Sequence, residues 1–503
     1  MKFLTVFILF ACVSAAWGQP NTSYYVATTG NDSNPGTESA PWRTIQHAAD
    51  TVHAGSTVYV RGGIYEELVR INVSGNASDG FVTVRGYPGE TAVLDATHFT
   101  PKDRQGVLTI QDQSYVRIEG LEIRNFRTAE HRLAPLGINV MGSGSHIELL
   151  NNNVHDIQQT FPGRDKPGSG GNGFGIAVYG TNAKAPITDL VIDGNEVHHL
   201  KTGSSESLVV NGNVTNFRIT HNTVHDNNNI GIDVIGFERT ASDPAVDQAR
   251  DGVVSHNLVY NITSRGNPAY GNDQSSDGIY VDGGTRILIE QNTIHDVDFG
   301  IELASEHKDR ATSYITARNN LIYHCHTAGV SIGGYAPDRG HTEHSIVINN
   351  TLYDNDTSST GSGEFQMQWN MSENVFANNI VFAGQRCLIS LTKTQVDKTQ
   401  PPPALIDHNL YYCAAGKEAS TWVEVSGTIK GFDDYVKSTG NDQHSRFGDP
   451  QFVNVAAHDF HLKPGSPAIG AGTVDKLPVG EFDLDGSPRI SSGKIDIGCY
   501  QKQ

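Results

Sequence analysis

The chain has few cysteines, few basic residues and no long apolar run beyond its N-terminus. Four of its 5 cysteines follow residue 18; they lack metal-type spacing and allow one or two disulfides of open pairing. Its 36 Lys and Arg stand against 55 Asp and Glu, a net charge of −19 that argues against nucleic acid as a partner. No later stretch approaches the roughly 20 apolar residues of a membrane span, so none is expected.

The first 18 residues have the pattern of a secretory signal peptide. Lys2 precedes an apolar stretch, and small residues follow that end near Gly18. This order of charge, apolar stretch and small residues is that of a cleaved export signal. We therefore expect cleavage near Gln19 and a secreted protein, either extracellular or periplasmic.

Helical periodicity is also nearly absent. One convincing 3.6-residue pattern covers residues 41–52, and no apolar helical stretch lies among the later repeats. The remaining chain consists of short β-branched runs with period-two alternation, interrupted by Gly, Asn and Asp. This composition excludes helical repeats and predicts an all-β protein.

A short phrase recurs eight times: Asn, then Val, Ile or Leu two residues later, and then usually His or Tyr. A minimum spacing near 27 residues with variable excess predicts a fixed coil that carries loops of different length. A stacked Asn would form an inward amide ladder. The copies begin at Asn152, Asn195, Asn222, Asn257, Asn292, Asn320, Asn350 and Asn379.

A coil of three short strands and three turns fits this spacing. The predicted fold is a right-handed parallel β-helix solenoid, in which like residues stack at about 4.8 Å per coil. After the signal peptide, we assign residues 19–56 to an N-terminal strand and a capping helix. Residues 57–403 form the β-helix, and residues 404–503 form a looped C-terminal cap.

The His or Tyr of the phrase also recurs on successive coils. Neighbouring imidazoles can bind zinc, but regular repetition through most of the stack favours a ladder that shapes a turn. The column consists of His155, His198, His225, Tyr260, His295, Tyr323 and Tyr353.

A second strand of each coil has the pattern Gly, apolar, variable, apolar, variable. Strand alternation places the apolar residues inside, so the variable residues are expected to face water. The first outward column contains Asn139, Ala177, Val209, Asp233, Tyr280, Glu302, Ser331 and Gln366. The second contains Met141, Tyr179, Asn211, Ile235, Asp282, Ala304, Gly333 and Gln368.

Acids, amides and tyrosines on one face suit a sugar polymer that lies along the stack. Long insertions at 157–174, 237–251 and 262–276 would wall this groove. A plain solvated exterior is the alternative, because acids and amides are ordinary there. The expected substrate-binding residues are Asn139, Tyr179, Asn211, Tyr280, Glu306, His307, Tyr335, Gln366 and Gln368.

Asp233, Asp282 and Glu302 are the candidate catalytic residues. Carboxylates one coil apart would lie about 5 Å apart and those two coils apart about 9 Å, which brackets the separations in retaining and inverting glycosidases. Like charges this close raise one pKa and supply the acid. Any one of these acids could instead bond loop backbone or bind calcium.

Three segments resemble known proteins: the opening that starts at Tyr24-Tyr-Val-Ala, the run Pro41-Trp-Arg-Thr-Ile-Gln, and the closing Asp496-Ile-Gly-Cys-Tyr. They are similar to segments of secreted right-handed β-helix proteins of pectin-lyase type, including the family-nine pectate lyases. The resemblance implies the architecture, and in those lyases an activity that needs calcium and a lysine base.

Carried over to this chain, the resemblance implies Asp277, Asp298 and Glu302 as calcium ligands. One aspartate of the family motif is replaced here by Phe299, and Ser331 stands at the position of the base lysine. An unactivated serine hydroxyl cannot replace a lysine amine as the base for a carbon acid.

Three functions remain open, all with a polysaccharide as the partner. Carboxylate-driven hydrolysis of glycosidic bonds, with no cofactor, is slightly favoured. A calcium-dependent pectate or uronate lyase is the second, and a non-catalytic carbohydrate-binding surface protein is the third. The sequence carries no signal for an oligomeric state.

Overall fold

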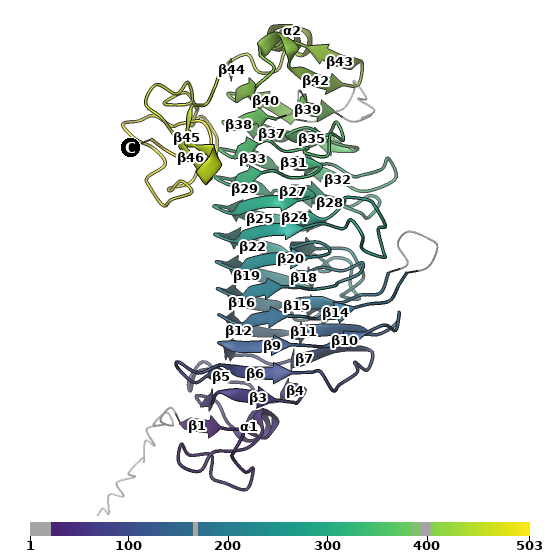
Figure 1. Ribbon diagram of the computed structural model, residues 1–503, viewed down its shortest axis with the longest axis vertical. Coiled ribbons are helices and arrows are strands. Elements are labelled where there is room, and N and C mark those ends of the chain that lie inside the picture. The colour runs from purple at the N-terminus through teal and green to yellow at the C-terminus, as the bar shows by residue number, and fades with distance from the viewer. Residues whose placement is uncertain (1–21, 164–169, 385–386, 392–403, 503) are drawn as a thin grey trace, which may run out of the picture.

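The computed structural model describes residues 22–163, 170–384, 387–391 and 404–502. The expected signal peptide lies outside these residues. Three parallel sheets run the length of the molecule and form an all-β right-handed parallel β-helix (Figure 1). No helix in the described part of the chain is long and apolar enough to cross a membrane.

The first sheet, here sheet I, has 16 strands. Its strands are β1 (Ser23–Val26), β2 (Thr57–Val60), β5 (Val82–Gly86), β8 (Val116–Glu119), β12 (Gly144–Leu150), β16 (Ile187–Asp193), β19 (Val214–Thr220), β22 (Arg250–Ser255), β25 (Thr285–Glu290), β29 (Thr316–Arg318), β33 (Ile346–Ile348), β37 (Asn374–Ala377) and β40 (Ala404–Asp407), with β28 (Ala311–Ser313), β32 (His341–Glu343) and β36 (Met371–Ser372) beside them.

Sheet II has 13 strands and carries the two outward columns. Its strands are β4 (Val69–Ile71), β7 (Arg104–Gln111), β11 (Ala134–Met141), β15 (Phe174–Gly180), β18 (Leu208–Gly212), β21 (Ile232–Ile235), β24 (Asp277–Asp282), β27 (Phe299–Ala304), β31 (Ala328–Ile332), β35 (Phe365–Met367), β39 (Cys387–Leu391), β42 (Thr421–Glu424) and β43 (Gly427–Lys430).

Sheet III also has 13 strands and contains the recurring phrase. Its strands are β3 (Gly63–Tyr65), β6 (Ala92–Asp95), β9 (Leu121–Arg124), β13 (Asn153–His155), β17 (Glu196–His198), β20 (Thr223–Asn227), β23 (Leu258–Ile262), β26 (Thr293–Val297), β30 (Leu321–Tyr323), β34 (Thr351–Tyr353), β38 (Ile380–Ala383), β41 (Leu410–Cys413) and β44 (Arg446–Phe447). Two short pairs lie outside the three sheets, β10 (Arg127–Thr128) with β14 (Gln158–Gln159) and β45 (Phe452–Asn454) with β46 (Asp459–Leu462).

The amide ladder is confirmed. Each ladder Asn donates from Nδ2 to Oδ1 of the Asn one coil later, at 2.9 to 3.3 Å, and its backbone N–H donates to the same oxygen. Nδ2 also donates to a backbone carbonyl, as Asn292 does to Val254 at 3.0 Å. Asn409 adds a ninth member, so the coils extend beyond the predicted limit at residue 403.

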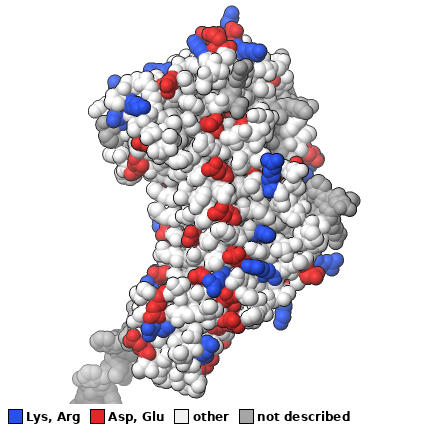
Figure 2. Space-filling view, in the orientation of Figure 1, with Lys and Arg blue, Asp and Glu red and all other residues white. Residues whose placement is uncertain are grey.

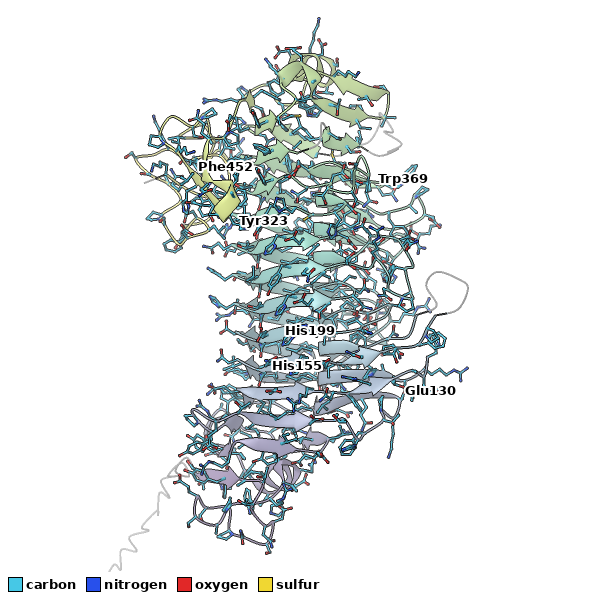
Figure 3. All side chains as sticks on the ribbon, in the orientation of Figure 1. Glu130, His155, His199, Tyr323, Trp369 and Phe452 are labelled. Atoms are coloured by element: carbon cyan, nitrogen blue, oxygen red, sulfur yellow. The ribbon has the colours of Figure 1, made fainter. Side chains whose placement is uncertain are left out.

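The His and Tyr column stacks as rings. From His155 to Tyr323, neighbouring ring centroids lie 4.7 to 5.1 Å apart, with planes within 11° of parallel. Figure 3 labels these two end members of the run. Flat stacking at the coil repeat supports the turn ladder over a zinc site. No three metal-binding side chains of this column converge in the described part of the chain.

The two ends are covered differently. Helix α1 (Ile45–Thr51) lies at the N-terminal end, with Thr44 Oγ1 accepting the His47 N–H at 3.2 Å. At the other end lie the β42–β43 hairpin, α2 (Phe432–Thr439) and a 3₁₀ turn, η1 (Lys417–Ala419); a second, η2 (Val455–Ala457), precedes β46.

The C-terminal segment folds back along the side of the stack instead of closing its end (Figure 1). Phe460 packs on Tyr323 at 5.3 Å, and Asn378 Nδ2 donates to the Thr473 carbonyl at 2.7 Å. Among the described residues, Cys325, Cys387 and Cys499 are not joined by a disulfide.

Candidate active site

The register of sheet II confirms the first outward column. Asn139, Ala177, Val209, Asp233, Tyr280, Glu302, Ser331 and Gln366 pair in that order on successive strands. In the second column, Met141, Tyr179, Asn211 and Ile235 pair in order, and Asp282 pairs with Ala304. The period-two pattern therefore placed the acids correctly along the stack.

The expectation that these side chains face open water is wrong for the middle coils. Asp233 is 2% exposed, Asp282 4% and Tyr280 5%. Tyr280 packs with Ile230 and Ala304, and its ring forms part of the floor. The loops at both edges of sheet II fold over this face, and period-two alternation carries no information about such cover.

One wall is formed by the predicted insertion at residues 237–251, which connects β21 to β22 and ends within the first residues of β22. The buried Asp247 carboxylate holds it by accepting the N–H groups of Arg239 at 2.6 Å and Ala241 at 2.8 Å. Asn211 fixes its start, because Nδ2 donates to Glu238 Oε2 at 2.8 Å and Oδ1 accepts the Thr240 hydroxyl at 2.7 Å. Both polar atoms of the Asn211 side chain therefore bond the loop and are not free to bind a ligand.

Asp298 anchors the opposite wall, the loop of residues 262–276. Its Oδ2 accepts the N–H groups of Ser264 at 2.9 Å and Ser276 at 3.0 Å, and its Oδ1 contacts His326 Nδ1 at 2.9 Å. Both oxygens are occupied and the residue is fully buried. Asp298 therefore does not fit the calcium role that the resemblance implied.

Replacing Asp298 by Asn is expected to destabilise the fold by about 2–4 kcal/mol, because an amide offers one acceptor where the carboxylate offers two to buried donors. Chemical denaturation measures the loss, and proteolysis in the 262–276 loop should become faster. Asp296→Asn is the matched control, since that carboxylate is exposed. Equal stability of the two variants would contradict the anchoring role.

Asp277 and Glu302 form a carboxyl pair on the floor. Asp277 is buried, and burial followed by the charge of Glu302 raises the pKa of Asp277 well above its usual range. A protonated Asp277 can therefore donate its O–H to Glu302. Burial also raises the pKa of Glu302 to about 7, against the lowering effect of its hydrogen bonds. Those bonds come from Asp277, from Ser331 Oγ at 3.3 Å and from Gln368 Nε2 at 2.8 Å.

Asp233 lies in the same column as Glu302, two coils away. At the strand spacing of a sheet, this is about 9–10 Å. Its Oδ1 is buried without a hydrogen-bond partner. Burial, followed by the charges of Glu206 and Asp282, raises the pKa of Asp233 well above its usual range.

Two acids of the site, Glu206 and Glu238, were not predicted from the sequence. Glu206 lies two residues before Leu208, as Asp277 lies two before Ile279, and these strands align through Ile232. This alignment could have identified Glu206 from the sequence. Burial and the charge of Glu238 raise the pKa of Glu206 to about 8. Glu238 lies on the irregular 237–251 loop, where no repeat could mark it.

Two clefts open beside the acids, and Arg239 lines both. A cleft of about 370 Å³ has Arg104, Tyr179, Glu206 and Glu238 in its lining. The Arg104 guanidinium lies 3.5 Å from the Tyr179 ring centre and covers one ring face.

The second cleft, of about 570 Å³, is lined in part by Glu306, His307, Lys308, Arg310 and Arg339. This cleft is locally basic, whereas acidic and basic side chains are interspersed over the face shown in Figure 2. Tyr335 is 47% exposed and packs under the Arg339 guanidinium at 4.8 Å.

The remaining predicted ligands are spread along the floor. Gln366 and Gln368 are half-buried around Ser331, whose hydroxyl accepts from Gln368 Nε2 at 2.7 Å. Asn139 is buried three coils from Asp233 and is not brought to the acids. Glu306 lies at the rim, with its N–H donating to Asp282 Oδ1 at 2.8 Å.

Comparison with known proteins agrees with this architecture. A family model described as "Pel9A-like, right handed beta helix region" matches residues 24–163, and the model "Right handed beta helix region" matches residues 172–411. The chain is 38% identical over 451 residues to Uncharacterized protein YwoF of Bacillus subtilis (strain 168), which covers 88% of this chain and 91% of that protein. The chain belongs to this family of right-handed β-helix proteins.

Other members of the wider β-helix group match less of the chain or match less closely. Pectate lyase PEL9 of Emericella nidulans is 35% identical over 131 residues, 25% of this chain and 32% of that protein. The crystal structure of a GH136 lacto-N-biosidase from Eubacterium ramulus superposes with a TM-score of 0.53 and 15% identity. The match covers 78% of this chain and 64% of that one, and shows the shared fold. Pectate lyase Pel9A gives a TM-score of 0.49 at 13% identity, over 96% of this chain and 97% of the other.

Proposed function

We propose that this protein is a secreted carbohydrate-active enzyme that hydrolyses glycosidic bonds of a polysaccharide in the groove of sheet II. The observation that carries the proposal is the carboxyl pair of Asp277 and Glu302, which holds a proton near neutral pH on the groove floor. A solvated exterior has no reason to bury and pair acids in this way. Asp233, two coils from Glu302, is the second carboxyl group of the proposed site.

Glu302 acts as the general acid. Gln368 and Ser331 fix its orientation, and it donates its proton to the leaving oxygen. The carboxylate that remains is stabilised by the O–H of Asp277 and by the Gln368 amide. Asp233 is assigned as the base that activates water; it can act only in its ionised form, which burial and the neighbouring acids disfavour by raising its pKa. The two-coil separation lies near the upper end of the range for inverting glycosidases.

Relatives support the substrate class. Pectate lyase PEL9 and the lacto-N-biosidase are both named for action on carbohydrates. The N-terminal signal pattern supports secretion. The basic residues of the larger cleft suit a polysaccharide with negatively charged sugars.

A calcium-dependent uronate lyase is the second candidate. It is favoured by the contact of Asp277 with Glu302, two of the three positions matched to calcium ligands. The third position, Asp298, is occupied by loop hydrogen bonds. The Ser331 hydroxyl, at the position of the base, is held between Glu302, Gln366 and Gln368. These contacts favour hydrolysis.

Product analysis separates the candidates. The secreted protein is incubated with neutral and uronate polysaccharides, while new reducing ends and the ultraviolet absorbance of unsaturated ends are both followed. Hydrolysis predicts reducing ends without that absorbance. Absorbance that rises with added calcium would overturn the proposal in favour of the lyase, and binding without either product would favour a carbohydrate-binding protein.

A further inference from the structure

Three metal-binding side chains from three separate segments converge beside the acid floor. Asp282 ends β24, Glu238 lies on the 237–251 loop, and His307 lies on the loop that follows β27. Each offers one ligand atom, and the three atoms lie within 4.8 Å of one another. These segments are joined only by the fold, so sequence spacing gives no sign of the cluster.

Hydrogen bonds from neighbouring residues orient the carboxylates of Glu238 and Asp282. Asn211 donates to Glu238 Oε2 at 2.8 Å, and the Glu306 N–H donates to Asp282 Oδ1 at 2.8 Å. Such supporting bonds are typical of metal-ligating carboxylates, because they fix the remaining oxygen. Asn211, which is buried and bonded to both Glu238 and Thr240, thus has a role in holding the metal-binding carboxylate in place.

The atoms that face one another are not bonded to each other. Asp282 Oδ2 lies 3.9 Å from His307 Nε2, which is beyond hydrogen-bond distance. His307 Nε2 is buried without any hydrogen-bond partner, and the Asp282 side chain is only 6% exposed. The buried His307 Nε2 and the buried Asp282 carboxylate face a common gap. A bound partner in this gap would satisfy both groups.

We propose that Glu238, Asp282 and His307 bind a divalent transition metal ion, with Zn²⁺ or Mn²⁺ as the fitting species. Metal–ligand bonds of about 2.0–2.2 Å place ligand atoms about 3–4 Å apart, so the three groups need only a small closure. An imidazole ligand selects against Ca²⁺, which takes oxygen ligands. Three protein ligands leave coordination positions open toward the larger cleft for water or a sugar oxygen.

The site is distinct from the Asp277, Asp298 and Glu302 set that the resemblance implied for calcium. It lies on the wall of the groove, and the binding of the ion does not depend on the hydrolytic function. The ion would offset the negative charge of the surrounding acids. It would also place a cation within reach of an anionic sugar bound in the larger cleft.

A second cluster in the described chain provides a contrast. Asp407, His408 and His444 also bring three ligand atoms within 4.8 Å of one another. There, His444 Nδ1 already contacts Asp407 Oδ2 at 2.6 Å, and the His444 ring is largely exposed. The groups satisfy one another, so we place no ion there and remove this cluster in the test by His444→Gln.

The test measures metal bound to the full chain that carries His444→Gln. The protein is stripped with a chelator, dialysed against Zn²⁺, Mn²⁺ or Ca²⁺ alone, and analysed for bound metal and by calorimetry. We expect one Zn²⁺ or Mn²⁺ per chain and at least tenfold weaker binding after His307→Gln or Glu238→Gln. Both positions lie on loops, so folding should be retained, which circular dichroism checks.

Two results would overturn the site: no retention of Zn²⁺ or Mn²⁺, or equal retention by the parent and the loop variants. Stronger binding of Ca²⁺ than of Zn²⁺ and Mn²⁺ would also overturn it. Polysaccharide hydrolysis is assayed in parallel with Glu302→Gln. If Glu302→Gln loses hydrolysis but still binds the metal, the metal site and the hydrolytic function are independent. The failure of one proposal can then be distinguished from the failure of the other.

Discussion

Replacing Glu302 by Gln is expected to lower kcat/KM for polysaccharide hydrolysis by about 10³-fold, the usual scale for loss of a general acid. The amide keeps the shape of the side chain and can still accept the Gln368 hydrogen bond at its oxygen. It has no proton to give to the leaving oxygen. KM should therefore change little, and the loss should fall on kcat.

The pH profile provides an independent check on the same residue. Because burial raises the pKa of Glu302 to about 7, the acid is protonated below that pH and ionised above it. Activity should therefore fall as the pH rises through about 7. Asp277→Asn keeps a hydrogen-bond donor toward Glu302, so it should retain most activity but shift this limb of the profile.

Glu290→Gln is the matched control. Glu290 lies on sheet I, where it accepts a hydrogen bond from Arg318 Nε at 2.8 Å. The same chemical change there should leave kcat/KM within about twofold. Glu302→Gln with more than a tenth of the parental activity would contradict the assignment of the acid.

The repeat explains why the position of Glu302 could be predicted. Each coil returns the same strand to the same place, so alternation and coil counting align Asp233, Tyr280 and Glu302 without knowledge of the loops. The same reasoning fails for Glu238, which lies on a loop between β21 and β22. Its position depends on Asp247 and Asn211, whose hydrogen bonds no periodic pattern reveals.

The alternation of the strands also could not predict which outward side chains are buried. An outward residue on a bare strand faces water, but Asp282 and Tyr280 are covered by loops from neighbouring coils. Family resemblance failed in a related way at Asp298. The position matched a calcium-ligand motif, yet the side chain bonds Ser264 and Ser276 because the 262–276 loop needs an anchor.

Removing one member of the amide ladder is expected to produce the largest loss of stability. Asn292→Leu keeps the side-chain size but leaves the Asn257 N–H and Nδ2 without their acceptor. It also leaves the Val254 carbonyl without a donor. At about 1–3 kcal/mol for each unsatisfied buried group, the expected loss is about 3–6 kcal/mol.

This loss is a large share of the stability of an ordinary domain, about 5–15 kcal/mol. Urea denaturation followed by circular dichroism measures it. His295→Tyr, in the same strand, is the control, because neighbouring coils carry Tyr260 and Tyr323 in that column, and it should cost less than about 1 kcal/mol. Equal stability of the two variants would contradict the ladder's role.

The chemistry of the ladder position explains why the repeat keeps Asn there. The oxygen must accept two hydrogen bonds from the coil before it, while the amino group donates to the next coil and to a carbonyl. Asp offers the acceptors but no donor, and would bury a charge. Asn292→Asp should therefore destabilise the protein at neutral pH and recover part of the loss in acid, where the carboxyl group regains a proton to donate.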